Sequence, residues 1–127
     1  MLWQTNVEAT QMATRTVVRA KRTSLRIKYH DIDITLSEER PALMMGRDQS
    51  ADLVIRDKMA SRSHGKIEQR LDKYVLSDHS ANGTFVTVEG EKEILLRREE
   101  FILRGHGMIT FGQSRSGTEE VVEYFCE

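Results

Sequence analysis

Three short polar segments interrupt the apolar runs of this sequence, at residues 46–47, 61–65 and 78–84. They consist of Gly-Arg, Ser-Arg-Ser-His-Gly and Asp-His-Ser-Ala-Asn-Gly-Thr. Polar segments between apolar runs are typical of loops, which carry many of the binding residues of globular domains. Because alternate loops of a β-sandwich gather at one end, we expect the three segments to face one site.

The side chains in and beside these segments match the chemistry of a phosphate group. Arg47 offers a planar fork of donors, Ser61 adds a short hydroxyl, and Lys58 and Arg62 add positive charge nearby. Asn82 presents both an amide donor and an amide acceptor, as needed to bind a peptide backbone. A phosphorylated side chain carries roughly −1.5 to −2 charges and three strong acceptors at neutral pH. These five residues are therefore the predicted phosphopeptide-binding set.

Two features of the same segments have simpler interpretations. Gly83 after Asn82 suits a tight turn that requires positive φ, and His64 suits a structural hydrogen-bonding role. Since His64 follows Ser61 closely, a small hydrolase built on this pair is an alternative. No orienting acid or nucleophile elbow accompanies the pair, so we assign no catalytic residue.

The composition excludes several classes of protein. The 127 residues fit one domain, and 19 Lys and Arg against 20 Asp and Glu give no general attraction to nucleic acid or an anionic membrane. No apolar run approaches the roughly 20 residues that span a bilayer. The four histidines lack ligand spacing, so neither a metal site nor a cofactor is expected. The lone Cys126 cannot form an internal disulfide, which agrees with a cytoplasmic location.

From Ser24 onward, apolar and polar residues alternate over short stretches, which is typical of β-strands. The pattern predicts ten or eleven short strands, separated by Gly, Asp, Asn and Ser, and little helix. The expected fold class is therefore all-β, a sandwich or a barrel. The expected core contains Leu25, Ile27, Ile34, Leu53, Ile67, Val75, Leu76, Phe85, Ile109 and Phe111.

Residues 1–23 are polar, rich in Thr and Ala, and show no sustained period. We interpret them as a linker or flexible tail with a short helical piece around Val7 to Ala13, and residues 24–127 as the folded domain. Such a leader indicates either a piece cut from a longer protein or a frayed native N-terminus.

The order and spacing of the motifs resemble the forkhead-associated (FHA) domain family. The resemblance covers about Ser24 to Cys126. It rests on Gly46-Arg47, on Ser61-Arg62 with His64 three positions after the serine, and on Asn82-Gly83-Thr84. It implies a SMAD/FHA-like sandwich of eleven strands that binds phosphothreonine peptides through loops at one end.

The resemblance also implies a role for each matching residue. Arg47 and Ser61 would contact the phosphate, Asn82 would bind the peptide backbone, and Arg62 would lie at the rim. The residues that would hold the loops in shape are Gly46, His64, Gly83 and Thr84.

Ala81 departs from the family pattern, which often has a Thr or Ser hydroxyl at this position. One donor to the phosphate is therefore missing, at a cost of roughly 1.5–3 kcal/mol. The nearby charges of Arg62 and Lys58 are candidates to offset this loss.

The predicted function is a phosphothreonine-dependent protein–protein interaction module in Ser/Thr kinase signalling, without enzyme activity of its own. Its partner would be a phosphothreonine-containing protein, in cis or in trans. Residues 89–101 are similar to FHA modules appended to bacterial class III adenylate or guanylate cyclases, which makes a nucleotide cyclase the expected parent protein. The alternative is a phosphate-independent dimerisation or intramolecular assembly domain, and a homodimer stays open.

Overall fold

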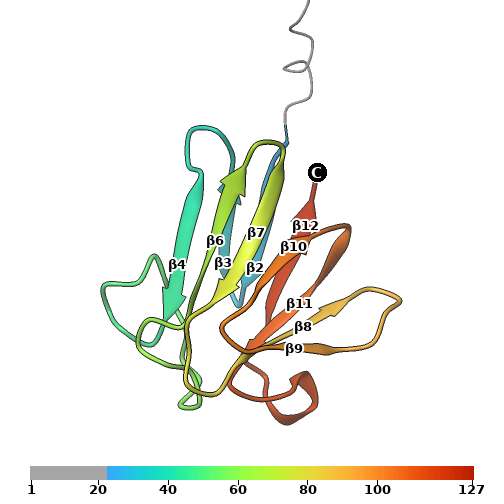
Figure 1. Ribbon diagram of the computed structural model, residues 1–127. Helices are drawn as coiled ribbons and strands as arrows, with labels where there is room; N and C mark the ends of the chain where they lie inside the picture. The colour runs from blue at the N-terminus through green and yellow to red at the C-terminus, as the bar shows by residue number, and fades with distance from the viewer. Residues whose placement is uncertain (1–22) are drawn as a thin grey trace, which may run out of the picture.

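The computed structural model describes residues 23–127, so the predicted tail before Thr23 and its helical piece lie outside the described residues. Eleven strands and one 3-10 turn follow, labelled as in Figure 1. The elements are β2 (Leu25–Tyr29), β3 (Ile32–Leu36), β4 (Ala42–Gly46), β5 (Leu53–Val54), β6 (Gly65–Arg70), β7 (Lys73–Asp78), β8 (Thr84–Val88), β9 (Ile94–Leu96), β10 (Glu100–Leu103), β11 (His106–Phe111), η2 (Arg115–Gly117) and β12 (Val122–Cys126).

The strands form two sheets that pack face to face (Figure 1). The five-stranded sheet has the order β10-β7-β6-β4-β5, and the six-stranded sheet has the order β3-β2-β12-β11-β8-β9. All neighbours are antiparallel except β4 and β5, which run parallel. The predicted all-β sandwich of about eleven short strands is thereby confirmed.

The core lies between the sheets and follows the period-two alternation of the strands. In β2, for example, Leu25, Ile27 and Tyr29 are buried while Arg26 is exposed. Burial of each large apolar side chain contributes roughly 1.5–3 kcal/mol, so this inner layer supplies most of the favourable free energy of folding.

Two residues expected in the core are only half-buried: Ile34 still packs against the core, but Phe85 does not, so the prediction is wrong for Phe85. Ile34 lies on β3, the edge of the six-stranded sheet, where no further strand covers it in the described chain. In β8 the buried side chains are those of Thr84, Val86 and Val88. Successive side chains of a strand point to opposite faces, so Phe85 is turned away from the core.

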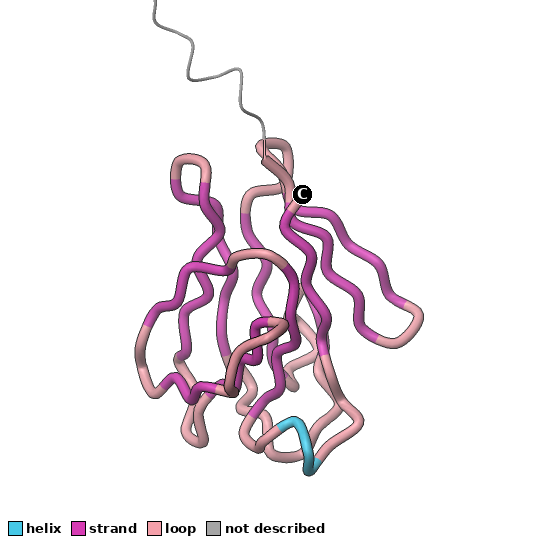
Figure 2. The backbone as a smooth tube through the Cα atoms, turned by 90° about the vertical axis from the view of Figure 1, so that its right-hand side faces the viewer, coloured by secondary structure: helices cyan, strands magenta, loops and turns pink. Residues whose placement is uncertain are grey.

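The loops that follow β4, β5, β7 and β11 gather at the lower end of the molecule in Figure 1. Figure 2, turned by 90°, shows the same end with the short η2 turn among the loops. The C-terminus lies at the opposite end in both views. There Ser24 and Glu127 exchange backbone hydrogen bonds of 3.4 and 3.0 Å. Between residues 23 and 127, no helix is long and apolar enough to cross a membrane.

Candidate functional site

The predicted binding residues meet around the short segment formed by Met59, Ala60 and Ser61. The backbone N–H of Arg47 donates to the Ser61 carbonyl at 3.0 Å, and Arg47 Nε donates to the Ala60 carbonyl at 2.6 Å. From the third loop, Asn82 Nδ2 donates to the Met59 carbonyl at 3.2 Å. The three loops therefore converge, and Arg47, Ser61 and Asn82 lie at the same end of the sandwich.

Arg47 is exposed but held in a defined orientation by its Nε bond to Ala60. Its two terminal nitrogens make no hydrogen bond or ion pair with residues 23–127. The half of the guanidinium that could bind a bidentate oxyanion is thus oriented and unoccupied by protein groups.

Ser61 is anchored through three of its atoms. Its carbonyl accepts from Arg47, its N–H donates to His64 Nδ1 at 2.9 Å, and its Oγ accepts from the Ala81 N–H at 3.0 Å. Because Oγ is the acceptor in this last bond, the hydroxyl hydrogen stays available for another acceptor. The hydroxyl is also brought next to Ala81, the position that departs from the family pattern.

Asn82 is exposed at the tip of the β7–β8 loop. Its Nδ2 donates to Met59, so its Oδ1 remains able to accept an N–H from an extended chain lying across the loops. Gly83 follows with φ of 92°, as the sequence predicts for this turn. A Cβ at Gly83 would lie 2.6 Å from Leu95 Cδ1, so the tight turn also requires the absence of a side chain.

Gly46 is required for a different reason, because its φ is not in the left-handed region. It ends β4 directly against the Ser61–His64 segment, where a Cβ would lie 2.0 Å from the Arg62 carbonyl oxygen. Any side chain would separate the strand end from this segment. Gly46 thus permits the close approach that places Arg47 beside Ser61.

His64 is fully buried and connects two of the loops. Its Nδ1 accepts from the Ser61 N–H, so the ring proton is on Nε2, which donates to the Gly83 carbonyl at 2.9 Å. The ring also contacts Phe111 edge-on, with 5.1 Å between ring centroids. Both nitrogens serve backbone groups, so the ring is not arranged as a base for the Ser61 hydroxyl, and the hydrolase alternative loses its proton acceptor.

Burial lowers the pKa of His64 below its usual value of 6.5, more than the Gly83 bond and the nearby Asp78 carboxylate raise it. The unfolded chain therefore binds more protons than the folded chain between 6.5 and that lower pKa. We expect the free energy of unfolding to fall by up to about 1.4 kcal/mol per pH unit as the pH drops through this window. Urea denaturation at a series of pH values measures this slope.

The matched variant for this measurement is His64→Gln, which cannot titrate. Its unfolding free energy is expected to be lower than that of the wild type at pH 7 but to fall less steeply as the pH drops through the same window. A wild-type slope that persists in His64→Gln would assign the pH dependence to other groups.

Asp78 is the buried acceptor that holds the β7–β8 loop. Its Oδ1 accepts from Ser80 Oγ at 2.6 Å and from Thr84 Oγ1 at 2.6 Å, and its Oδ2 accepts from the Arg98 N–H at 2.9 Å. Ser80 Oγ in turn accepts from the Gly83 N–H at 2.7 Å. Burial raises the pKa of the carboxyl, but these hydrogen bonds outweigh burial and leave the pKa below its usual value.

The sequence analysis included Asp78 and Ser80 in the third polar segment but predicted no role for them. It missed Asp57 altogether. Asp57 is 5% exposed, and its carboxylate accepts from the Met59 N–H, from Gln113 Nε2 and from Thr118 Oγ1 at 2.8–3.0 Å. It thus joins the segment that carries Ser61 to the loop after β11. An Asp two residues before a loop N–H is only a weak sequence signal for a loop-holding carboxylate. Hydrogen-bond partners more than 50 residues away give no local sequence signal at all.

Lys58 and Arg62 are exposed beside Ser61 and form no ion pair with any described residue. The ion pairs of lysine and arginine in the described chain instead involve Arg26, Lys66, Arg70, Lys73 and Arg104. Arg47, Lys58 and Arg62, the cations in or beside the predicted segments, therefore lack carboxylate partners within residues 23–127. This arrangement favours a polyanionic ligand. Residues 23–127 contain no cluster of side chains suited to hold a metal ion.

Comparison with known proteins agrees with this geometry. The family model of the FHA domain matches residues 43–112, which include all three loops. A search of curated proteins finds no match.

Similar solved structures include the FHA-1 domain of Mycobacterium tuberculosis Rv1747, with 18% identity, a TM-score of 0.62, and coverage of 84% of this chain and 98% of that one. The N-terminal FHA domain of Saccharomyces cerevisiae Rad53p, solved with a phosphothreonine peptide, has 21% identity and a TM-score of 0.58, and the match covers 80% and 90% of the chains. Mycobacterium tuberculosis EmbR, solved with a low-affinity phosphopeptide, has 20% identity and a TM-score of 0.56, with 82% and 24% covered.

Proposed function

This chain belongs to the FHA domain family, and on that premise we propose that it binds phosphothreonine-containing segments of other proteins in Ser/Thr kinase signalling. We propose that it acts as a binding module and has no enzyme activity of its own. The single observation that carries the proposal is the convergence of an oriented guanidinium, a hydroxyl and an amide from three loops at one end.

The phosphate would lie between Arg47 and Ser61. The terminal nitrogens of Arg47 would donate to two phosphate oxygens, and the Ser61 hydroxyl would donate to a phosphate oxygen. The bonds to Ala60 and Ala81 already fix both side chains, so little conformational entropy is lost on binding. Lys58 and Arg62 would add long-range attraction that weakens with salt.

The peptide backbone would lie beside Asn82. Its Oδ1 would accept a backbone N–H next to the phosphothreonine, while Nδ2 keeps its bond to Met59. One contact would thus bind the ligand and brace two loops. We propose that Gly46, His64, Gly83 and Thr84 act indirectly, through the loop contacts described above.

An oriented phosphothreonine peptide library, probed with the wild type and Arg47→Ala side by side, tests the proposal. We expect phosphorylated peptides to be selected over their unphosphorylated twins by the wild type alone. We also expect enrichment of Asp and Glu near the phosphothreonine, because Lys58 and Arg62 lack carboxylate partners. Equal binding of phosphorylated and unphosphorylated peptides would instead favour the phosphate-independent assembly domain.

Replacing Ala81 with threonine is expected to tighten phosphopeptide binding. The Ala81 N–H already bonds to Ser61 Oγ, so a hydroxyl at this position would start close to the phosphate. One added hydrogen bond to a charged group corresponds to a gain of roughly tenfold in affinity. Isothermal titration calorimetry with one phosphothreonine peptide measures this gain in affinity, by comparing Ala81→Thr with Ala81→Val. Equal affinities of the two variants would contradict a role for the hydroxyl.

We propose that the folded domain spans residues 24–127. The backbone pair between Ser24 and Glu127 supports a domain of residues 24–127, with the preceding residues as a linker. A nucleotide cyclase as parent, a bacterial source, a cytoplasmic location and a homodimer remain predictions from the sequence.

A further inference from the structure

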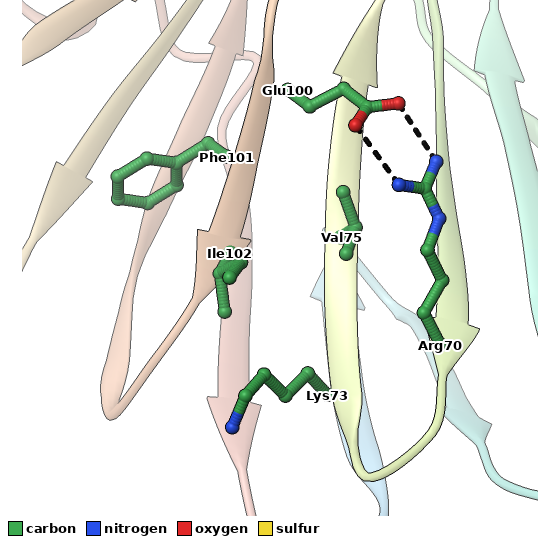
Figure 3. Close-up of a pocket in the computed structure, with 6 residues that line it drawn as sticks. All are labelled: Arg70, Lys73, Val75, Glu100, Phe101 and Ile102. Atoms are coloured by element: carbon green, nitrogen blue, oxygen red, sulfur yellow. Dashed lines mark hydrogen bonds and ion pairs between the residues drawn. The ribbon is translucent and has the colours of Figure 1, made fainter.

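β10 is the edge strand of the five-stranded sheet, and its outer face carries an uncovered apolar surface. Ile102 is 50% exposed and stands opposite Val75 of β7. A surface cavity of about 380 Å³ lies along this face, lined by Ile102 and Val75, by Phe101, and by charged side chains at both ends (Figure 3). Edge strands are usually protected by a bulge, an inward-pointing charge or a covering segment. Among the described residues no further strand pairs with β10.

The hydrogen bonds of β10 show which of its backbone groups point outward. The Asp78 N–H donates to the Glu99 carbonyl at 3.0 Å, so Glu99 and Asp78 form a hydrogen-bonded pair at the start of the ladder. In an antiparallel ladder such pairs alternate with pairs whose backbone groups point away from the partner. Counting along β10, the N–H and C=O of Glu100 and Ile102 point away from β7, toward the open edge.

The residues of this edge are self-complementary about Ile102. Two antiparallel copies of the strand centred there would place Ile102 opposite Ile102, Phe101 opposite Leu103, and Glu100 opposite Arg104. The outward N–H and C=O groups of the two Ile102 residues would then bond to each other. Both charged side chains are about half exposed, at 53% for Glu100 and 55% for Arg104, and each pairs within its own chain, Glu100 with Arg70 at 2.8 Å and Arg104 with Glu91 at 2.7 Å, so pairing across the interface would share or replace these contacts.

We propose that two copies of this chain associate through β10, with a two-fold axis at Ile102 and a continuous sheet across the interface. The two-fold pairing aligns opposite charges twice and joins the apolar rows of Val75 and Ile102 from both copies. A second copy fits this edge because the charges that flank Ile102 are of opposite sign and equally spaced. This inference goes beyond phosphopeptide binding and does not depend on it.

Sedimentation velocity of the full chain over a series of concentrations tests the proposal. A four-residue strand pair buries less than a standard interface, so we expect a dissociation constant on the order of 10–100 µM. Ile102→Lys is expected to weaken the dimer at least about tenfold, through loss of apolar contact and repulsion of two lysines on the axis. Ile94→Lys is the matched control, because Ile94 is 38% exposed on β9 of the other sheet, and its variant should dimerise normally.

A charge exchange tests the two-fold register. Glu100→Arg should weaken the dimer, and the double variant Glu100→Arg with Arg104→Glu should restore it. A chain that stays monomeric at all concentrations would overturn the proposal, including the case in which residues 1–22 or another protein covers β10. Equal dimerisation of Ile102→Lys and wild type, or no rescue by the double variant, would overturn it as well. Arg47→Ala should dimerise normally and Ile102→Lys should bind phosphopeptide normally, so failure of one proposal is distinguishable from failure of the other.

Discussion

Arg47→Ala is expected to weaken binding of a phosphothreonine peptide by at least about hundredfold while leaving the fold intact. The side chain is exposed, and its only bond to the described chain is from Nε to the Ala60 carbonyl. Its terminal nitrogens would supply charge-assisted hydrogen bonds, each worth roughly 1.5–3 kcal/mol. Calorimetric titration with a phosphorylated peptide measures the loss, and circular dichroism with thermal unfolding checks the fold.

Arg47→Lys is the matched control for this result. Lysine keeps the positive charge but loses the planar fork and the Nε bond that orients it. We expect its affinity to fall between those of the wild type and Arg47→Ala. Unchanged phosphopeptide affinity in Arg47→Ala would place the phosphate elsewhere.

Asp78→Ala is expected to be the most destabilising single substitution in the loops, lowering the free energy of unfolding by about 3–5 kcal/mol. It removes the shared acceptor of the Ser80 and Thr84 hydroxyls and of the Arg98 N–H, and the two hydroxyls are buried away from water. The unfolding temperature should fall on the order of 10–20 °C. Phosphopeptide affinity should also fall at temperatures where the variant is folded, because Ser80 no longer fixes the Gly83 N–H beside Asn82.

Asp52→Ala provides the comparison for this variant. The Asp52 carboxylate accepts one N–H, from Met44 at 2.7 Å, and its side chain is exposed. We expect a loss of about 1 kcal/mol and unchanged phosphopeptide binding. If the two variants unfold at the same temperature, the network around Asp78 does not stabilise the loop.

Local patterning was sufficient to predict the class of fold. Alternation over five-residue stretches, as in β2, is a property of neighbouring residues and needs no knowledge of the partner strands. The alternation does not determine which face of β8 points to the core. Thr84, Val86 and Val88 form one face, Phe85 and Thr87 form the other, and both faces contain apolar residues. The hydrogen bond from Thr84 to the buried Asp78 places Thr84 inside and turns Phe85 outward.

For the site, the residue types and spacing in the sequence determined that three loops carry groups suited to a phosphate, together with a glycine turn after Asn82. Only the tertiary structure decided that these groups meet, because antiparallel pairing of β4 with β6 and of β6 with β7 brings all three loops to one end. It also decided that Asp57 and Asp78 hold the loops, through partners as distant as Thr118. Side chain type and turn geometry are local properties of a sequence. The distance between two loops depends on the pairing of strands far apart in the chain, so it cannot be predicted from the local spacing of residues.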